Sequence, residues 1–362
     1  MDTFAALATP SVLVDRSRLT ANIRSMQAVC NAHGVELRPH IKTHKMVAVA
    51  RLQLAAGAAG LTCAKLGEAE AMLPSGVSQL FVGHSLVDVG QASRVAALAE
   101  RLDDFRVAIT SEAHLEPLAR LAAAVGHKLR VMMAVDTGLG REGVRSPESA
   151  SRIAASLANH RHLELRGFYS HEGHMYGAPP NEVEARVEAM LAHLCAVRDG
   201  IDPSLALWPG CSVTAKVVAS LSRGRVQAVR PGAYMFGDLA LTQTTGVMPL
   251  KDVAVHVLST VVDRPEPGLA LIDAGSKTFS GDRTAQNIHA IAADGRDISV
   301  VRVNEEHGYL RGGDVDALQV GERLRFIPAH VCPVLNLTDR VTVVENDAVV
   351  DSWAVEARGR TQ

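Results

Sequence analysis

The chain has 362 residues, of which 47% are hydrophobic and 21% charged, with a formal net charge of -2 at pH 7. This composition is typical of a globular protein with one large and one smaller domain, and the near-neutral charge argues against nucleic acid or an anionic membrane surface as a partner. No apolar run reaches the roughly 20 residues of a membrane span, and residues 1–3 begin nothing like a signal peptide, so we expect a cytoplasmic protein.

The cysteines support the same compartment. They are Cys30, Cys63, Cys195, Cys211 and Cys332, an odd number of widely scattered positions without a CxxC pair. This spacing predicts free thiols in a reducing environment.

The first two thirds of the chain alternate between two kinds of segment. A short strand at 9–15 and a helix at 16–33 are followed by apolar or β-branched runs and alanine-rich helices. The predicted strands are 35–39, 60–63, 79–82, 105–109, 129–135, 163–169, 205–208 and 226–229. The predicted helices between them are 45–56, 66–73, 87–102, 112–125, 147–159 and 181–199.

Eight strands with intervening helices predict a (β/α)8 TIM barrel at residues 10–240. The runs are too apolar for a sheet with one face in water. A doubly wound sheet would suit the first half equally well, and the eighth strand favours the barrel.

After Gly237 the pattern changes to strand-like runs separated by turn residues. It predicts a smaller, mainly antiparallel β domain formed by residues 241–362 and 1–9. Its predicted strands are 253–262, 269–272, 298–303, 323–328 and 341–344. The polar stretch 279–295 is predicted to be a long surface loop.

Basic residues crowd the segment 37–45, where the first barrel strand should end. Lys42 would then lie at the mouth of the barrel, a position from which an amine can reach a carbonyl cofactor such as pyridoxal phosphate. A solvated basic loop explains the segment equally well at this point.

Other chemically active side chains follow other barrel strands. The fifth strand leads into a glycine-rich turn, 136–143, with Arg141, and the sixth leads into Tyr169, His171 and His174. The last two strands lead into turns with small or basic residues that suit a phosphate. These residues are Gly210, Cys211, Ser212, Thr214, Arg230, Gly232 and Tyr234. Each of these residues, taken alone, is more often a helix cap or a surface residue. Taken together, they follow different strands at the same rim of the predicted barrel, and this favours a site.

His330 and Cys332 are two residues apart in a segment predicted to be extended. Both side chains would then point to one face, where an imidazole and a thiolate could hold a cation such as zinc. Two ligands are too few for a structural site, so positions for water or substrate would stay open. A buried cysteine beside a structural histidine is at least as common.

Several motifs together resemble the D-threonine aldolase and D-serine dehydratase family. They are 38–45 (RPHIKTHK), 63–70 (CAKLGEAE), Asp136-x-Gly138 with Arg141, 230–232 (RPG), 273–275 (DAG) and 330–333 (HVCP). Members of that family are fold-type III pyridoxal-phosphate enzymes, built like alanine racemase from a barrel and a β domain. The resemblance covers residues 9–358.

The resemblance implies a role for each candidate. Lys42 would bind the cofactor aldehyde covalently, whereas its rival Lys45 is expected inside the following helix. Apart from the catalytic candidates His171 and His174, the other rim residues would bind the cofactor. Arg141 would lie near its phenolic oxygen and Arg230 against its ring nitrogen. His330 and Cys332 would bind a divalent metal, Zn, Mn or Mg. A homodimer is also implied.

The implied reaction acts on a β-hydroxy-D-amino acid as substrate. If Lys42 takes the α proton, the hydroxyl leaves and a keto acid and ammonia result. If His174 or His171 takes the hydroxyl proton, retro-aldol cleavage gives glycine and an aldehyde. Cysteine at 332 favours the dehydratase, since the aldolases of the family carry aspartate there.

The substrate side chain stays open between serine, threonine and 3-hydroxyaspartate, the last suggested by the basic residues Arg38, His40 and His44. An amino-acid racemase and a non-catalytic pyridoxal-phosphate carrier are less favoured alternatives. The racemase needs no metal, and the carriers lack a β domain.

Overall fold

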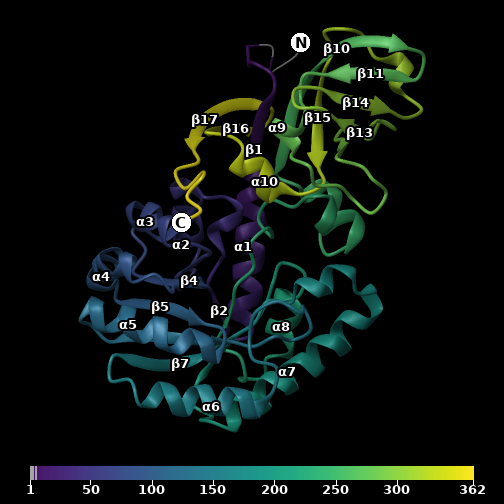
Figure 1. Cartoon of the computed structure of the whole chain (residues 1–362). Coiled ribbons are helices and arrows are strands. Elements are labelled where there is room, and N and C mark those ends of the chain that lie inside the picture. Colours follow the sequence, from purple (N-terminus) through teal and green to yellow (C-terminus); the bar gives the residue numbers. More distant parts are fainter. Residues whose placement is uncertain (1–3, 5) are drawn as a thin grey trace. The chain divides into compact units, whose positions relative to one another are not determined.

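The computed structural model describes Phe4 and residues 6–362 (Figure 1). Residues 1–3, on which the signal-peptide expectation rests, lie outside the described residues. The chain divides into two compact units. The barrel unit is Arg24–Lys42, Val49–Gly232 and Arg360–Gln362, and the β unit is the described part of the chain up to Ile23, Thr43–Ala48 and Ala233–Gly359. In the described part of the chain, no helix combines the length and the apolar character needed to cross a membrane.

Short strands alternate with helices in the barrel unit. The strands are β2 (Glu36–Leu37), β3 (Leu61–Cys63), β4 (Gln79–Ser85), β5 (Asp104–Ile109), β6 (Leu129–Ala134), β7 (Leu163–Tyr169), β8 (Ala206–Trp208) and β9 (Ala228–Val229). The helices are α1 (Arg16–Ala32) and α2 (Val47–Ala55), both of which start in the β unit, and α3 (Leu66–Met72), α4 (Ala92–Arg101), α5 (Leu115–Val125), α6 (Pro147–Ala158), α7 (Val183–Asp199) and α8 (Ala215–Leu221). All the predicted barrel strands are confirmed, and α8 is a short helix that was not predicted.

The strands of the barrel unit follow one another around a parallel ring. β3 to β8 form one sheet in chain order, and β2 pairs in parallel with β9. Backbone hydrogen bonds join the two sheets on both sides. Thr62 N–H donates to Pro39 O at 2.8 Å, and Gln227 N–H donates to Leu207 O at 3.1 Å. The predicted barrel is therefore confirmed, with its first and last strands reduced to two residues each.

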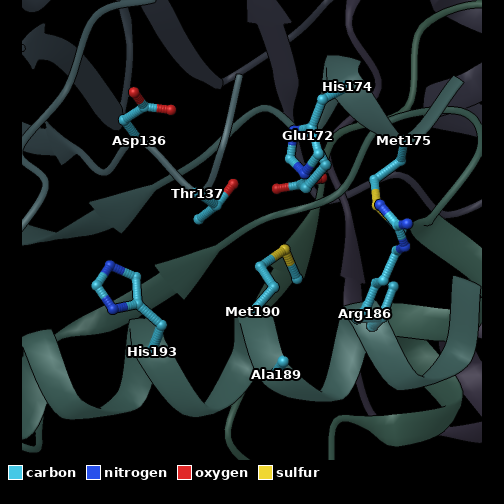
Figure 2. Close-up of a pocket in the computed structure, with 10 residues that line it drawn as sticks. Asp136, Thr137, Glu172, His174, Met175, Arg186, Ala189, Met190 and His193 are labelled. Carbon is cyan, nitrogen blue, oxygen red and sulfur yellow. The ribbon is translucent and has the colours of Figure 1, made fainter. Parts of the chain in front are cut away.

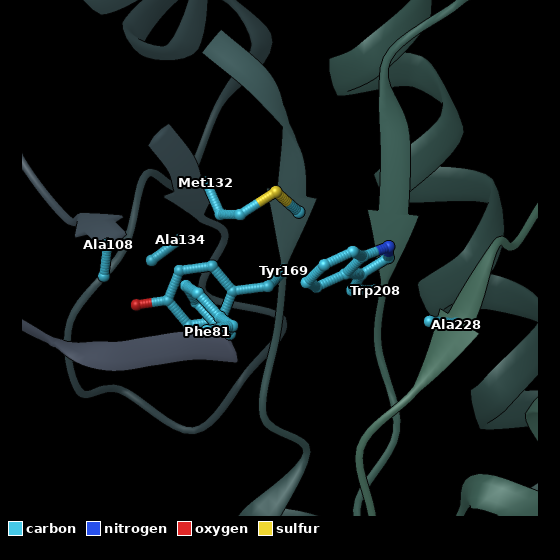
Figure 3. Packing of buried hydrophobic residues seen from close by; sticks show 7 residues of the cluster. All are labelled: Phe81, Ala108, Met132, Ala134, Tyr169, Trp208 and Ala228. Atoms are coloured by element: carbon cyan, nitrogen blue, oxygen red, sulfur yellow. The ribbon is translucent and has the colours of Figure 1, made fainter. Parts of the chain in front are cut away.

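The interior of the barrel is filled by side chains from successive strands (Figure 3). The cluster consists of Phe81, Ala108, Met132, Ala134, Tyr169, Trp208 and Ala228. The ring of Phe81 meets those of Tyr169 and Trp208 edge to face, at centroid distances of 4.9 and 5.8 Å. The alanines leave room for these rings, which keeps the packing dense. Because Tyr169 and Trp208 end their strands, this layer forms the floor under the rim.

The described residues of the β unit form a nine-stranded sheet in the order β11-β14-β13-β12-β15-β10-β1-β16-β17. The bounds are β1 (Ser11–Asp15), β10 (Val255–Glu266), β11 (Leu269–Ile272), β12 (Ala290–Ala292), β13 (Ser299–Val303), β14 (Gly308–Arg311), β15 (Arg323–Pro328), β16 (Arg340–Glu345) and β17 (Ala348–Ala354). β11 also pairs with β10, so the part of the sheet from β10 to β15 closes on itself. Two short helices, α9 (Ser276–Phe279) and α10 (Val331–Asn336), follow β11 and β15. The predicted antiparallel β domain is confirmed.

The predicted surface loop in this unit was wrong. The stretch 279–295 is not a continuous surface loop, because it contains β12, which pairs with β13 and β15. Three residues are too few for a strand pattern, and the neighbouring strands determine its structure. β1 pairs with β10 and β16 in the same sheet. The domain limits 10–240 and 241–362 with 1–9 stay a prediction, and residues 1–3 and 5 of that last segment lie outside the described residues.

Candidate active site

Lys42 lies in a short 3-10 turn, Ile41–Thr43, that follows β2. The strand itself ends at Leu37, and the chain continues in extended form to His40, which forms a parallel bridge with Thr62 beside β3. The backbone N–H of Lys42 donates to His40 Nδ1 at 3.3 Å. The side chain of His40 thus helps to fix the turn that presents the half-buried Lys42.

The other basic residues of this segment have structural roles. Arg38 is buried, forms an ion pair of 2.8 Å with Glu36, and stacks on Trp208 at 4.4 Å from the ring centroid. His44 is buried as well, and its Nδ1 accepts the backbone N–H of Met46 at 3.0 Å. Arg38 and His44 are therefore committed inside the fold and do not support recognition of a dicarboxylic substrate.

Lys45 does not lie inside α2, contrary to the prediction. It precedes the helix with a positive φ of 56°, and its Nζ donates to Ala357 O at 3.5 Å. The left-handed conformation breaks the chain direction between the turn at Lys42 and the start of α2 at Val47. Lys45 belongs to the β unit and is buried there.

The turn after β6 is organised by Asp136. Its carboxylate accepts the backbone N–H groups of Gly138 and Gly140, both at 3.1 Å, and pairs with Arg145 at 3.1 Å. Burial tends to raise the pKa of Asp136, but these hydrogen bonds outweigh it and lower the pKa below its ordinary value. Arg141 is exposed on the same turn and pairs with Glu142 at 3.1 Å.

The residues after β7 bring several predicted groups together. Tyr169 is buried, and its hydroxyl donates to Gly83 O at 3.0 Å; burial raises its pKa. Burial lowers the pKa of His171 to about 3, and the positive charges of Lys42, Arg230 and Arg141 lower it further. These three charges come from three different turns of the rim and act on one imidazole in a fourth turn.

Glu172 is completely buried between the turns after β7 and β8. Its carboxylate accepts Gly210 N–H at 2.9 Å and the Thr214 hydroxyl at 3.1 Å. The Thr214 hydroxyl also accepts Cys211 N–H at 3.0 Å. Three hydrogen-bond donors expected for a phosphate, Gly210 N–H, Cys211 N–H and the Thr214 hydroxyl, are thus already bound within the chain. Burial also raises the pKa of the Cys211 thiol to about 11.

Arg230 follows β9 and is buried. Its guanidinium donates to Trp208 O at 3.0 Å and to Ser170 O, and lies over the rings of Tyr169 and Phe81 at 5.0 and 5.5 Å. Burial lowers its pKa. Nearby, Gly232 N–H donates to Ser212 Oγ at 3.1 Å, which joins the last two turns of the rim. Tyr234 is buried in the β unit, which begins again at Ala233.

A cavity of about 400 Å³ opens between these turns and α7 (Figure 2). It is lined by Asp136, Thr137, Glu172, His174, Met175, Arg186, Val187, Ala189, Met190 and His193. Thr137 Oγ1 and His174 Nδ1 are buried and have no hydrogen-bond partner in the described part of the chain. Two orphaned polar atoms on one wall indicate a site that binds a polar ligand or water.

His330 and Cys332 lie in the β unit. The expectation of an extended segment was wrong, because His330 is the N-cap residue of α10 and Cys332 belongs to its first turn. The two side chains still meet. Burial lowers the pKa of His330, but hydrogen bonds to Cys332 and Asp282, with the charges of Cys332 and Asp238, raise it to about 9. Cys332 Sγ also lies 3.3 Å from the hydroxyl of Thr43, the residue after Lys42 in the chain.

The residues present fit both implied groups. The charges that act on His171 are all positive, so an anionic cofactor would compensate them, and the half-buried Lys42 offers an amine. A thiol and an imidazole in contact suit a borderline-soft divalent cation. Among the described residues no cluster of three or more metal-ligating side chains is present.

Sequence reasoning missed two site residues. Glu172 was visible only as one polar residue between two histidines, and nothing in its spacing shows that it turns inward to the following strand. Asp282, whose Oδ2 lies 2.6 Å from His330 Nδ1, fell in the predicted loop. A carboxylate 48 residues from its partner leaves no pattern in one sequence.

Comparisons with known proteins agree with this organisation. The model "alanine racemase, N-terminal domain" matches residues 14–240, and "putative serine dehydratase domain" matches residues 254–344. The chain is 30% identical to the D-threo-3-hydroxyaspartate dehydratase of Delftia sp. (strain HT23), over 97% of this chain and 98% of that protein. It is 28% identical to the D-threonine aldolase of Arthrobacter sp., over 99% of this chain and 94% of that protein.

Solved structures agree as well. D-threonine aldolase from Filomicrobium marinum superposes with a TM-score of 0.88 at 27% identity, covering 98% of this chain and 97% of that one. A cysteine-to-alanine variant of D-threo-3-hydroxyaspartate dehydratase in the metal-free form also gives a TM-score of 0.88, at 28% identity, covering 98% of this chain and 99% of that one. The fold, the family models and these relatives lead to one conclusion: the chain belongs to the D-threonine aldolase and D-serine dehydratase family, with an alanine racemase-like fold, and is an enzyme of the lyase class.

Proposed function

We propose that the chain is a pyridoxal-phosphate- and divalent-metal-dependent lyase that dehydrates a β-hydroxy-D-amino acid to a keto acid and ammonia. The observation that carries this proposal is the placement of Lys42, Arg141 and Arg230 in turns that follow three different parallel strands of one barrel. All three positive charges act on His171, which follows a fourth strand. The relatives named as dehydratase and aldolase of β-hydroxy-D-amino acids support the same substrate class. The homodimer that the family resemblance implies stays a prediction.

Bound pyridoxal phosphate would supply an electron sink for the substrate's α carbon, and a bound divalent cation would polarise its β-hydroxyl. Lys42 would hold the cofactor and, once a substrate amine replaces it, take the α proton at Nζ as general base. Arg230, fixed by two carbonyls and two rings, would face the cofactor ring without giving up its proton. The proposed metal ligands are His330 and Cys332.

The two histidines of the rim would have different roles. His171, with a pKa of about 3, is neutral near pH 7 and a poor proton acceptor, so it would serve as a hydrogen-bonding group. His174 faces the cavity beside Thr137 (Figure 2) and has a buried Nδ1 without a partner in the described residues. The proton at the substrate hydroxyl would therefore be handled by His174.

Cys332 supports dehydration over cleavage. A thiolate beside His330 would bind a soft cation tightly, and the solved cysteine variant of a dehydratase is in the metal-free form. D-Threonine aldolase activity is the second candidate, supported by the 28% identity to the enzyme of that name and by His174 as a base for the hydroxyl. The sequence argument for 3-hydroxyaspartate as the substrate is weakened, because two of the basic residues that suggested it, Arg38 and His44, are buried.

Incubating the purified protein with pyridoxal phosphate, a divalent metal and D-serine, D-threonine or D-3-hydroxyaspartate tests the proposal. We expect ammonia and keto acid in excess over glycine. Lys42→Ala should abolish both products, whereas Lys216→Ala, on the exposed surface of α8, should not change them. A chelator should stop the reaction, and added zinc or manganese should restore it. Product formation by Lys42→Ala, or racemisation insensitive to chelator, would overturn the proposal.

A further inference from the structure

The starting observation is a fully buried acidic side chain that the proposed reaction does not use. Glu172 has no exposed surface, although it follows β7 at the rim where the chain turns toward solvent. Burying a carboxylate is costly unless hydrogen bonds and opposite charge compensate it. The surroundings of Glu172 supply both.

Glu172 fastens two turns of the rim together. Besides Gly210 N–H at 2.9 Å and the Thr214 hydroxyl at 3.1 Å, it takes a short hydrogen bond from the Ser170 hydroxyl. Its own backbone carbonyl faces the Cys211 thiol, with Sγ 3.7 Å from the oxygen. The turn after β8 is therefore wrapped around a carboxylate of the chain itself, in the place where the sequence suggested a phosphate.

Arg230 is the matching buried cation. It forms hydrogen bonds with two backbone carbonyls and stacks on two rings, and within the described ranges no carboxylate forms an ion pair with it. Burial lowers the pKa of Arg230, and the neighbouring Tyr169 and Glu172 oppose this effect, Glu172 by its negative charge. Ser170 links the two residues, because its carbonyl accepts from Arg230 and its hydroxyl donates to Glu172.

We infer that Glu172 is a positioning residue, the built-in counter-charge that fixes Arg230 and the Gly210–Thr214 turn under the bound cofactor. The inference concerns the proposed pyridoxal-phosphate site and in that respect rests on the proposed function. The pairing of Glu172 with Arg230 is a property of the protein alone and can be tested without any ligand.

A double-mutant cycle in the apoprotein tests the pairing. The proteins are the wild type, Glu172→Gln, Arg230→Met and the double variant, all carrying Trp353→Phe so that Trp208 is the remaining tryptophan. Each is unfolded in urea and followed by the fluorescence of Trp208. Each single change leaves one buried charge without its partner, so each should lower the unfolding midpoint. The double variant should lose clearly less than the sum of the two, even recovering folding if a single variant does not fold. Additive losses, or a double variant that stays unfolded, would overturn the pairing.

The cofactor spectrum tests the positioning role. Removing a negative charge near a titrating group makes protonation harder, so the pH midpoint of the bound cofactor's absorbance change should fall in Glu172→Gln, by about one unit. Glu172→Asp keeps the charge and should hold the wild-type midpoint. An unchanged midpoint in a folded Glu172→Gln protein would reduce Glu172 to a structural residue. If no variant and no wild-type protein binds pyridoxal phosphate, the proposed function fails, while the apoprotein cycle still decides the pairing.

Discussion

The imidazole of His330 is oriented by Asp282. The carboxylate oxygen Oδ2 lies 2.6 Å from Nδ1, which holds a proton on that nitrogen. A cation would therefore bind at Nε2 and replace the second proton, which the raised pKa keeps on the ring. Metal-binding histidines commonly use a carboxylate in this way, because it fixes the ring and makes the free nitrogen a better donor. Both side chains are partly exposed, so the effect on overall stability should be small.

Asp282→Asn should weaken metal binding without unfolding the protein. An amide at this position holds the imidazole less firmly, and losses of about 10- to 100-fold in metal affinity are typical for such partners. Competition with a chromophoric zinc chelator measures the affinity directly. Asp294→Asn is the matched control, since Asp294 pairs with Arg296 in the same unit. Equal affinities in both variants would exclude Asp282 as the orienting residue.

Single residues differ in how well the sequence predicts their role. Lys42 was predicted because it follows an apolar run in a barrel pattern, and it does lie in the turn after β2, while its role stays a prediction. Arg38 suggested recognition of an acidic substrate because it precedes Lys42 in a basic segment, but its side chain stacks on Trp208. Side-chain direction after a strand depends on the turn that follows, and one sequence does not determine it.

At the scale of elements, α10 shows how a short helix is held in place from afar. Its N-cap residue, His330, makes no side-chain capping bond. Asp238 instead accepts Val331 N–H at 3.0 Å through Oδ2 and Leu241 N–H at 3.0 Å through Oδ1. Burial raises the pKa of Asp238, and these hydrogen bonds limit the rise. The proposed metal ligands thus sit on a helix that begins on a buried carboxylate.

Asp238→Asn should destabilise the β unit. The amide offers one acceptor where the carboxylate offers two, so one buried N–H loses its partner at a cost of about 1–3 kcal/mol. The free energy of unfolding can be followed by Trp353 of β17 in proteins that all carry Trp208→Phe. Asp339→Asn, at an exposed carboxylate, is the control. If the two variants have equal stability, the cap contributes nothing measurable.

Elements with a strong apolar pattern could be predicted, and short ones could not. The barrel strands are buried runs, so their residues appear in sequence as hydrophobic segments between alanine-rich helices. β12, β14 and β17 have little pattern of their own. β17 is largely exposed and pairs only with β16 within the described residues, so it depends on its neighbour in the sheet. The segment with His330 and Cys332 was predicted to be extended, whereas α10 begins at Val331 and has proline at position 333 in its first turn, where a helix tolerates it.

For the whole molecule, each compact unit contains a histidine that burial keeps neutral. His171 in the barrel unit and His256 on β10 in the β unit both have a pKa lowered to about 3. For His256 burial is the main cause, followed by the charges of Arg18 and Arg325, while Asp347 opposes them. Because an unfolded histidine titrates near 6.5, the unfolded state binds protons first as the pH falls. Both units should therefore be less stable in acid.

His256→Gln should remove part of this acid sensitivity from the β unit. In the wild type, the contribution of His256 is fully present above about pH 6.5 and decreases as the pH falls, by about 2 kcal/mol between roughly pH 7 and pH 5. The variant cannot take up that proton, so its free energy of unfolding should change less with pH, even if it is lower at neutral pH. Trp353 fluorescence with Trp208→Phe in every protein reports the β unit alone, which avoids a two-state assumption for the whole chain. His307→Gln, at an exposed histidine of the same unit, should keep the wild-type pH slope. If His256→Gln keeps that slope too, His256 is not the neutral buried group that makes the β unit acid-sensitive.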